Sequence, residues 1–109
     1  MSTTIAWAML VAAGILDVLW AVSLKYAEGF SKLGWSLLSL LLLGGLVWLL
    51  GRSLLVLPVG TAYAVWTGIG AAGTVLIGIV LFGEGMDPMR LFWIGLIVIG
   101  TVGLKVGTA

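Results

Sequence analysis

The chain has 109 residues, of which 62% are hydrophobic and only 8% are charged, and its formal net charge is +1. This composition lies far outside the range of soluble globular domains and is typical of an integral membrane protein. The small net charge provides neither a basic field for nucleic acid nor an acidic tail. Because cysteine and histidine are absent, disulfides, thiol catalysis, imidazole acid–base chemistry and most transition-metal sites are excluded.

Four apolar stretches, separated by three short polar breaks, are predicted to be transmembrane helices. They cover residues 5–24, 33–51, 59–82 and 89–106. Each has about the 17 to 25 residues that a helix needs to cross a bilayer, and a segment that spans lipid must satisfy its backbone internally. The predicted fold is therefore an all-α membrane protein, with one four-helix transmembrane domain over residues 1–109.

Residues in the polar breaks indicate where the helices end and begin. Gly29 can stop the first helix, and Pro58 suits the first turn of the third. Asp87 followed by Pro88 is the pattern of an N-cap before a proline at the first helical position. Local chemistry thus supports the boundaries that hydropathy predicts.

The basic residues give the chain little preference for one orientation. Arg52 and Lys105 fall on one side of the membrane, whereas Lys25, Lys32 and Arg90 fall on the other. Two basic residues against three is a weak bias under the positive-inside rule. The chain could therefore insert both ways, and two oppositely oriented copies could pair.

One carboxylate, Asp17, lies roughly 18 Å along the first predicted span, near mid-depth of the bilayer. An ionised carboxylate there costs on the order of 3 kcal/mol. Acids at such positions usually face a bundle interior or a wet cavity and serve ion or proton pathways. The alternative is an acid tolerated at a helix end or paired for packing, but this helix offers only Lys25, two turns away.

Asp17 shares a helix face with Gly14, which leaves space, and with Trp20, which supplies an aromatic wall. This combination suits a small organic cation, because the indole face adds about 0.5 to 2 kcal/mol to the attraction of the charge. Tyr63 and Trp66, three residues apart on the third helix, could orient the acid or a planar donor. We therefore expect Asp17 to bind a proton or substrate, and Gly14, Trp20, Tyr63 and Trp66 to line the site.

Burial disfavours the charged form of a carboxyl group, so Asp17 is expected to hold a proton when no cation is bound. Proton and organic cation would then compete for one site. Competition combined with alternating access is coupled exchange.

Small residues crowd the third and fourth predicted helices, and they favour close approach of helix backbones. The pair Gly68 and Gly70 could also soften the third helix into a hinge. Four helices enclose little volume, so a cavity around Asp17 is expected to need a second subunit, with the fourth helix as the seam. The small residues concerned are Gly60, Ala64, Gly68, Gly70, Ala71, Ala72, Gly73 and Gly78 on the third helix, and Gly95, Gly100, Gly103 and Gly107 on the fourth.

Three runs of sequence resemble the small multidrug resistance family: GILDVLWAVSLKY at 14–26, LPVGTAYAVWTGIG at 57–70 and GLK at 103–105. The resemblance implies four helices per subunit, an antiparallel dual-topology homodimer in the bacterial plasma (inner) membrane, and proton-coupled export of cations. The family's central acid corresponds to Asp17. Trp20 resembles the guanidinium-exporter branch, since the polyaromatic-drug branch has glycine there.

Two positions depart from that family pattern. The family's acid is glutamate, and Asp17 is one methylene shorter, so its oxygens lie roughly 1.3 Å closer to the helix. Leu46 stands where the guanidinium branch has a serine that helps to orient the acid. A leucine-rich second helix makes the site more apolar, which could widen the substrate range.

The leading prediction is a proton-coupled antiporter that exports guanidinium-type cations, with protons as the coupling ion and no cofactor. One alternative is efflux of quaternary ammonium compounds and aromatic drugs, and another is one subunit of a paired heterodimer. An enzyme is not expected, because no nucleophile, metal set or phosphate-binding loop is evident. The expected partners are the substrate cation, membrane lipid and a second copy of the chain, without nucleic acid.

Overall fold

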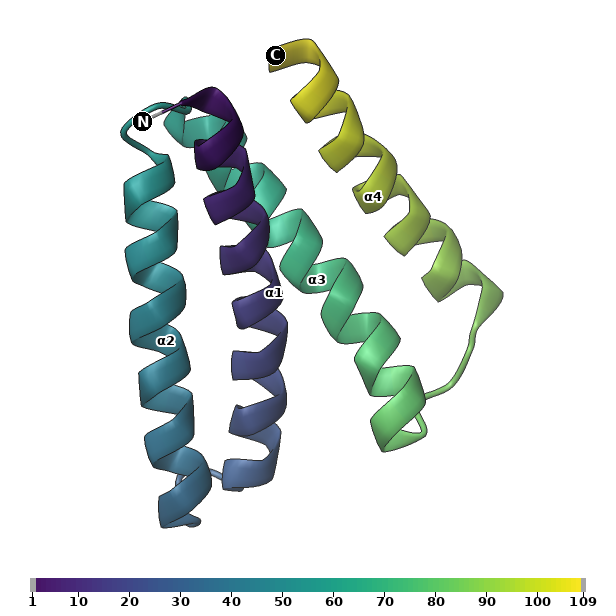
Figure 1. Ribbon diagram of the computed structural model, residues 1–109. Helices are drawn as coiled ribbons and strands as arrows, with labels where there is room; N and C mark the ends of the chain where they lie inside the picture. Colours follow the sequence, from purple (N-terminus) through teal and green to yellow (C-terminus); the bar gives the residue numbers. More distant parts are fainter. Residues whose placement is uncertain (1, 109) are drawn as a thin grey trace.

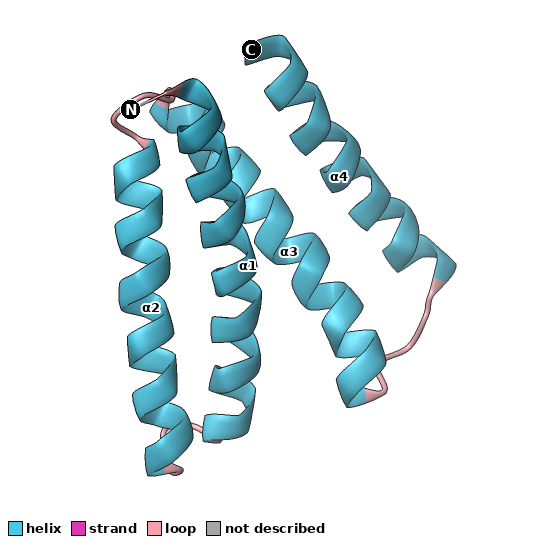
Figure 2. Cartoon of the chain, in the orientation of Figure 1, coloured by secondary structure: helices cyan, strands magenta, loops and turns pink. Residues whose placement is uncertain are grey.

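The computed structural model describes residues 2–108, and within them it contains four helices and no strand (Figures 1 and 2). The helices are α1 (Thr3–Ala27), α2 (Leu33–Ser53), α3 (Val59–Phe82) and α4 (Pro88–Thr108). Each is long and apolar enough to cross a membrane. The predicted all-α membrane fold is confirmed, and every predicted span lies inside one helix.

Helix α1 is the centre of the bundle. Helices α2 and α3 both pack on it, α2 alongside and α3 crossing at an angle, whereas α4 packs on α3 and leans away from the rest (Figure 1). Both chain ends and the α2–α3 connection lie at one end of the bundle, and the other two connections lie toward the opposite end. Helices α1 and α3 therefore run in the same direction.

The buried apolar core lies near the beginnings of α1 and α3. Side chains from the first turns of α1 meet side chains from the start of α3, and Trp66 and Ile69 pack against them. Asp17 lies beyond this core, in the second half of α1. The buried core residues are Ala6, Trp7, Leu10, Leu57, Ala62 and Val65.

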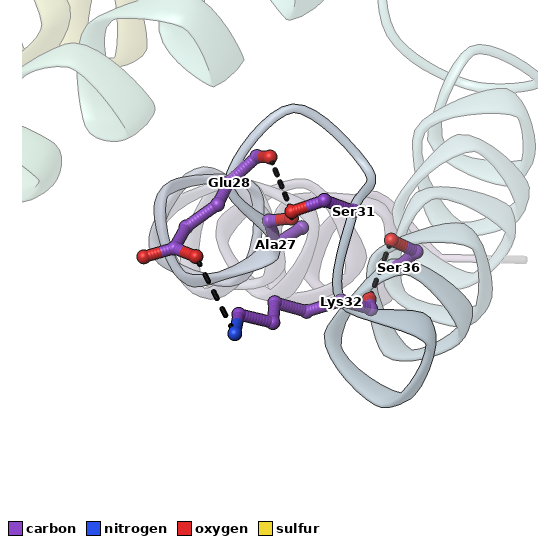
Figure 3. Close-up of polar contacts among 5 residues, drawn as sticks. All are labelled: Ala27, Glu28, Ser31, Lys32 and Ser36. Atoms are coloured by element: carbon purple, nitrogen blue, oxygen red, sulfur yellow. Dashed lines mark hydrogen bonds and ion pairs between the residues drawn. The ribbon is translucent and has the colours of Figure 1, made fainter.

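The connection between α1 and α2 is a tight left-handed turn. Glu28, Gly29 and Phe30 have φ angles of 49°, 70° and 67°. Ser31 Oγ donates to the Glu28 carbonyl at 2.8 Å, and Lys32 Nζ lies 3.7 Å from the Glu28 carboxylate (Figure 3). Gly29 takes the left-handed conformation at no steric cost, but the left-handed C-cap that ends α1 is Glu28, one residue before the predicted glycine. These contacts hold the ends of α1 and α2 beside each other.

The N-terminus of α4 has the cap that the sequence predicts. Asp87 Oδ1 accepts a hydrogen bond from the backbone N–H of Met89 at 3.0 Å, and the helix begins at Pro88. We expect Asp87→Ala to lower the free energy of unfolding by about 1 kcal/mol, because one helix donor loses its acceptor. Unfolding in mixed micelles with rising dodecyl sulfate measures this change. Asp87→Asn, which keeps an acceptor, is the control, and an equal loss in both variants would contradict the capping role.

Candidate functional site

The Asp17 carboxylate lies directly against the backbone of Gly70 on α3. A Cβ atom built on Gly70 would overlap Asp17 Oδ2, so only glycine leaves room for the acid in this position. Asp17 is half-buried, and among residues 2–108 no side chain forms an ion pair or hydrogen bond with it. The carboxylate oxygens thus remain available to a ligand.

Two close contacts between α1 and α3 flank this position. A Cβ on Gly14 would stand 2.6 Å from Ile69 Cγ2, and a Cβ on Gly73 would stand 2.6 Å from Val18 Cγ2. The two helices are therefore in close contact on either side of Asp17 as well as at Gly70, which fixes the acid relative to α3. The space that Gly14 leaves is occupied by Ile69 within this subunit, so Gly14 serves helix packing here.

Tyr63 and Trp66 form an aromatic pair on α3. Their ring centroids are 5.3 Å apart and the rings meet edge to face at 71°. Trp66 packs against the apolar core, and its buried Nε1 has no hydrogen-bond partner in the described chain. Trp66 precedes Gly70 by four residues, or about 6 Å along the axis. A buried indole donor without an acceptor is unusual, because such groups are normally hydrogen-bonded.

Tyr63 is 60% exposed and faces the space between α3 and α4. It lines a cavity of about 610 Å³ together with Thr67 and residues of α4 that include Gly100 and Thr101. No hydrogen bond joins the Tyr63 hydroxyl to Asp17 in the described part of the chain. The single subunit thus leaves Tyr63 open to a molecule that approaches from outside the α1–α3 contact.

Trp20 follows Asp17 by one helical turn and is half-buried. Its backbone carbonyl accepts a hydrogen bond from Ser23 Oγ at 2.6 Å, and within residues 2–108 its ring takes part in no aromatic or cation–π pair. Its place as an aromatic wall remains a prediction that rests on its position three residues after the acid.

Gly70 is the site residue that the sequence alone did not reveal. Its pairing with Gly68 suggested a hinge, but α3 is a continuous helix, and both glycines lie at close contacts: Gly70 at Asp17, and Gly68 at Thr101 of α4. The GxG spacing was the available signal, because glycine in a membrane helix often marks close approach of another group. Leu46, the second departure from the family pattern, is fully buried.

The comparisons with known proteins agree with this architecture. A profile described as Small Multidrug Resistance protein matches residues 5–97. The guanidinium exporter of Escherichia coli strain K12 is 52% identical over 103 residues, covering 94% of this chain and 98% of that protein. Proteins with the same name from Yersinia pseudotuberculosis and Citrobacter freundii are 50% and 48% identical over 103 residues; each match covers 94% of this chain, and 99% and 98% of those proteins. The chain therefore belongs to the small multidrug resistance family of transporters and is a multi-pass bacterial inner-membrane protein, not an enzyme.

Proposed function

We propose that this protein exports guanidinium-type organic cations in exchange for protons, and that Asp17 binds both in turn. The observation that carries the proposal is the half-buried Asp17 carboxylate packed against Gly70, with which no cationic side chain among residues 2–108 forms an ion pair. A charge so placed in a membrane span is costly unless it is neutralised. The relatives named guanidinium exporters support the choice of cation.

A guanidinium ion matches this site chemically. Its planar N–H donors can form two parallel hydrogen bonds to a carboxylate, which are stronger than bonds between neutral groups. Trp20 would supply an aromatic face to the bound cation. The unpartnered Nε1 of Trp66 supports a role in orienting a carboxylate, with Tyr63 as a second donor. Gly14 would contribute by allowing the close helix contact beside the acid.

Exchange follows if proton and cation cannot occupy Asp17 together. A cation that binds expels the proton, and a proton that arrives on the other side of the membrane expels the cation. No group besides the shared carboxylate and a change of access is needed for this coupling.

We propose that the working unit is an antiparallel homodimer. Within the described residues no side chain of α4 is buried, and α4 packs along α3, with Lys105 reaching the ring of Trp7 on α1. Added Cβ atoms on the four α4 glycines at 95, 100, 103 and 107 would meet nothing within 4 Å. Small residues open to the outside allow a second helix to pack closely. A second copy on α4 would also close the space that Tyr63 faces.

Proton movement in proteoliposomes tests the proposed exchange. Adding guanidinium outside liposomes that contain the intact protein is expected to drive protons across the membrane, read by a pH-sensitive dye. Asp17→Asn should abolish this signal while the protein still folds and reconstitutes. Absence of guanidinium-driven proton movement in the unmodified protein would contradict the proposal.

Dual topology can be tested by labelling one introduced cysteine, because the chain has none of its own. Met86 lies in the exposed α3–α4 connection and is 67% exposed. In cells that express Met86→Cys, we expect an impermeant maleimide to label roughly half of the molecules, since the charge bias is weak. Complete labelling, or none before the membrane is permeabilised, would show a single orientation.

Quaternary ammonium efflux remains the second candidate function. It is favoured by the fully buried Leu46, which places an alkyl side chain in the interior where the guanidinium branch has a hydroxyl. A more apolar interior would tolerate cations that lack N–H donors.

A further inference from the structure

A second carboxylate, that of Glu84, packs against a glycine of α3, as the Asp17 carboxylate does. A Cβ on Gly78 would overlap Glu84 Oε1, just as a Cβ on Gly70 would overlap Asp17 Oδ2. The two glycines are eight residues apart, which is about 12 Å along the helix axis. Glu84 follows the end of α3, and its backbone N–H donates to the Gly78 carbonyl at 3.2 Å. Both carboxylates therefore pack against α3. Asp17 does so within the membrane span, and Glu84 does so near the edge of the span.

A cavity of about 270 Å³ lies between these two positions. Its walls include Ala21, one helical turn beyond Asp17 on α1, and Thr74, one turn beyond Gly70 on α3. Glu84 and Arg90 line its outer end. A water molecule takes about 30 Å³ of liquid, so the cavity has room for a small cation and some water. It therefore begins one turn from the proposed cation site and ends at a carboxylate.

The side chain that pairs with the Glu84 carboxylate, Arg90, itself ends in a guanidinium group. Arg90 Nη2 donates to Glu84 Oε1 at 2.7 Å, and Arg90 Nη1 donates to the Gly85 carbonyl at 3.4 Å. Both side chains are partly exposed, at 36% for Arg90 and 42% for Glu84, so solvent weakens the pair. A weak pair between a guanidinium and a carboxylate can be exchanged by a free guanidinium, which offers the same fork of donors.

The third charged residue that lines the cavity, Lys25, forms no ion pair with Glu84. Lys25 Nζ lies 5.9 Å from the centroid of the Phe82 ring, in a cation–π arrangement. Lys25 and Arg90 together make the net charge of the lining positive. A substrate cation at Glu84 is thus bound weakly and released readily, as expected of a transient site along a transport path.

We propose that Glu84 is an outer binding site for guanidinium-type cations, in which the substrate replaces Arg90 on its way between Asp17 and the membrane surface. This inference rests on the proposed function, because it names a second residue that contacts the same substrate. It assigns Glu84 to substrate contact, Arg90 to competition with the substrate, and Thr74 to the wall of the passage.

Binding without Asp17 tests the outer site. Guanidinium is titrated into ¹⁵N-labelled Asp17→Asn protein in micelles, and the amide shifts of Thr74 and Gly78 are followed. Adding Arg90→Gln should tighten this binding at least fivefold, because the internal competitor is gone. Adding Glu84→Gln to that double variant should remove the saturable shifts. Shifts that persist without Glu84, or an affinity that does not respond to Arg90→Gln, would overturn the proposal.

A second measurement uses the otherwise unmodified protein with Glu84→Gln alone, in case the Arg90 variant does not fold. We expect the KM for guanidinium transport to rise at least threefold, while the equilibrium affinity at Asp17 changes less than twofold. Unchanged KM would overturn the outer site. Failure of the proposed function is distinguishable, because it would appear as absent guanidinium-driven proton movement in the unmodified protein, whereas the titration of the Asp17→Asn series does not depend on transport.

Discussion

Gly70→Ala is expected to reduce guanidinium affinity about fivefold or more, although the substitution adds only one methyl group. The new Cβ would overlap Asp17 Oδ2, so the carboxylate must rotate or α1 must move away. Overpacking of this kind costs about 1 to 3 kcal/mol, and 1.4 kcal/mol corresponds to a tenfold change in affinity. Calorimetric titration of the purified protein with guanidinium measures the effect directly.

Gly44→Ala is the matched control for this prediction. Gly44 also lies within an apolar helix, but a Cβ there would meet no atom within 4 Å. We expect the guanidinium affinity of the Gly44→Ala variant to stay within twofold of the affinity of the unmodified protein. If the two alanine variants bind equally well, the position of Asp17 against Gly70 is irrelevant to binding.

Guanidinium is expected to bind at least tenfold more tightly than tetramethylammonium. Both carry one positive charge, but only guanidinium can donate hydrogen bonds to the Asp17 carboxylate. Hydrogen bonds to charged groups contribute about 1.5 to 3 kcal/mol each, and one such bond gives roughly a tenfold to hundredfold preference. Competition of each cation against a labelled guanidinium compound measures the ratio.

The same comparison separates the two candidate functions. Equal affinities, or tighter binding of tetramethylammonium, would favour quaternary ammonium efflux. Asp17→Asn should weaken both cations and reduce the difference between them, because an amide donates as well as accepts and carries no charge. A preference that keeps its full size after this change would show that the main hydrogen-bond acceptor of guanidinium is a group other than Asp17.

The features that local sequence controls were predictable. Hydropathy and length predicted the four helices, because a lipid-spanning backbone must be helical over about 20 residues. The cap at Asp87 was predictable too, since it depends only on its immediate neighbours, and the end of α1 was predictable to within one residue, because its left-handed cap is Glu28 beside Gly29. Asp17 could be selected from the sequence because an acid at that depth is costly whatever surrounds it.

The pairing of residues across helices was not predictable in the same way. Which residue of α3 meets Asp17 depends on how α3 crosses α1, and a shift of one residue rotates the helix by about 100°. The sequence therefore suggested Gly14 as open space, whereas Ile69 fills it, and suggested Gly70 as a hinge, whereas it makes room for the acid. Trp20 and Tyr63 do not contact Asp17 through any described hydrogen bond, so their roles remain predictions.

The most direct test of the account is guanidinium affinity measured as a function of pH. A protonated Asp17 cannot bind the cation, so the apparent affinity is scaled by the deprotonated fraction. Affinity should be constant above the pKa of Asp17 and should fall tenfold for each pH unit below it, while Asp17→Asn should show weak binding at every pH. Affinity that is independent of pH in the unmodified protein would contradict a carboxylate shared between proton and substrate.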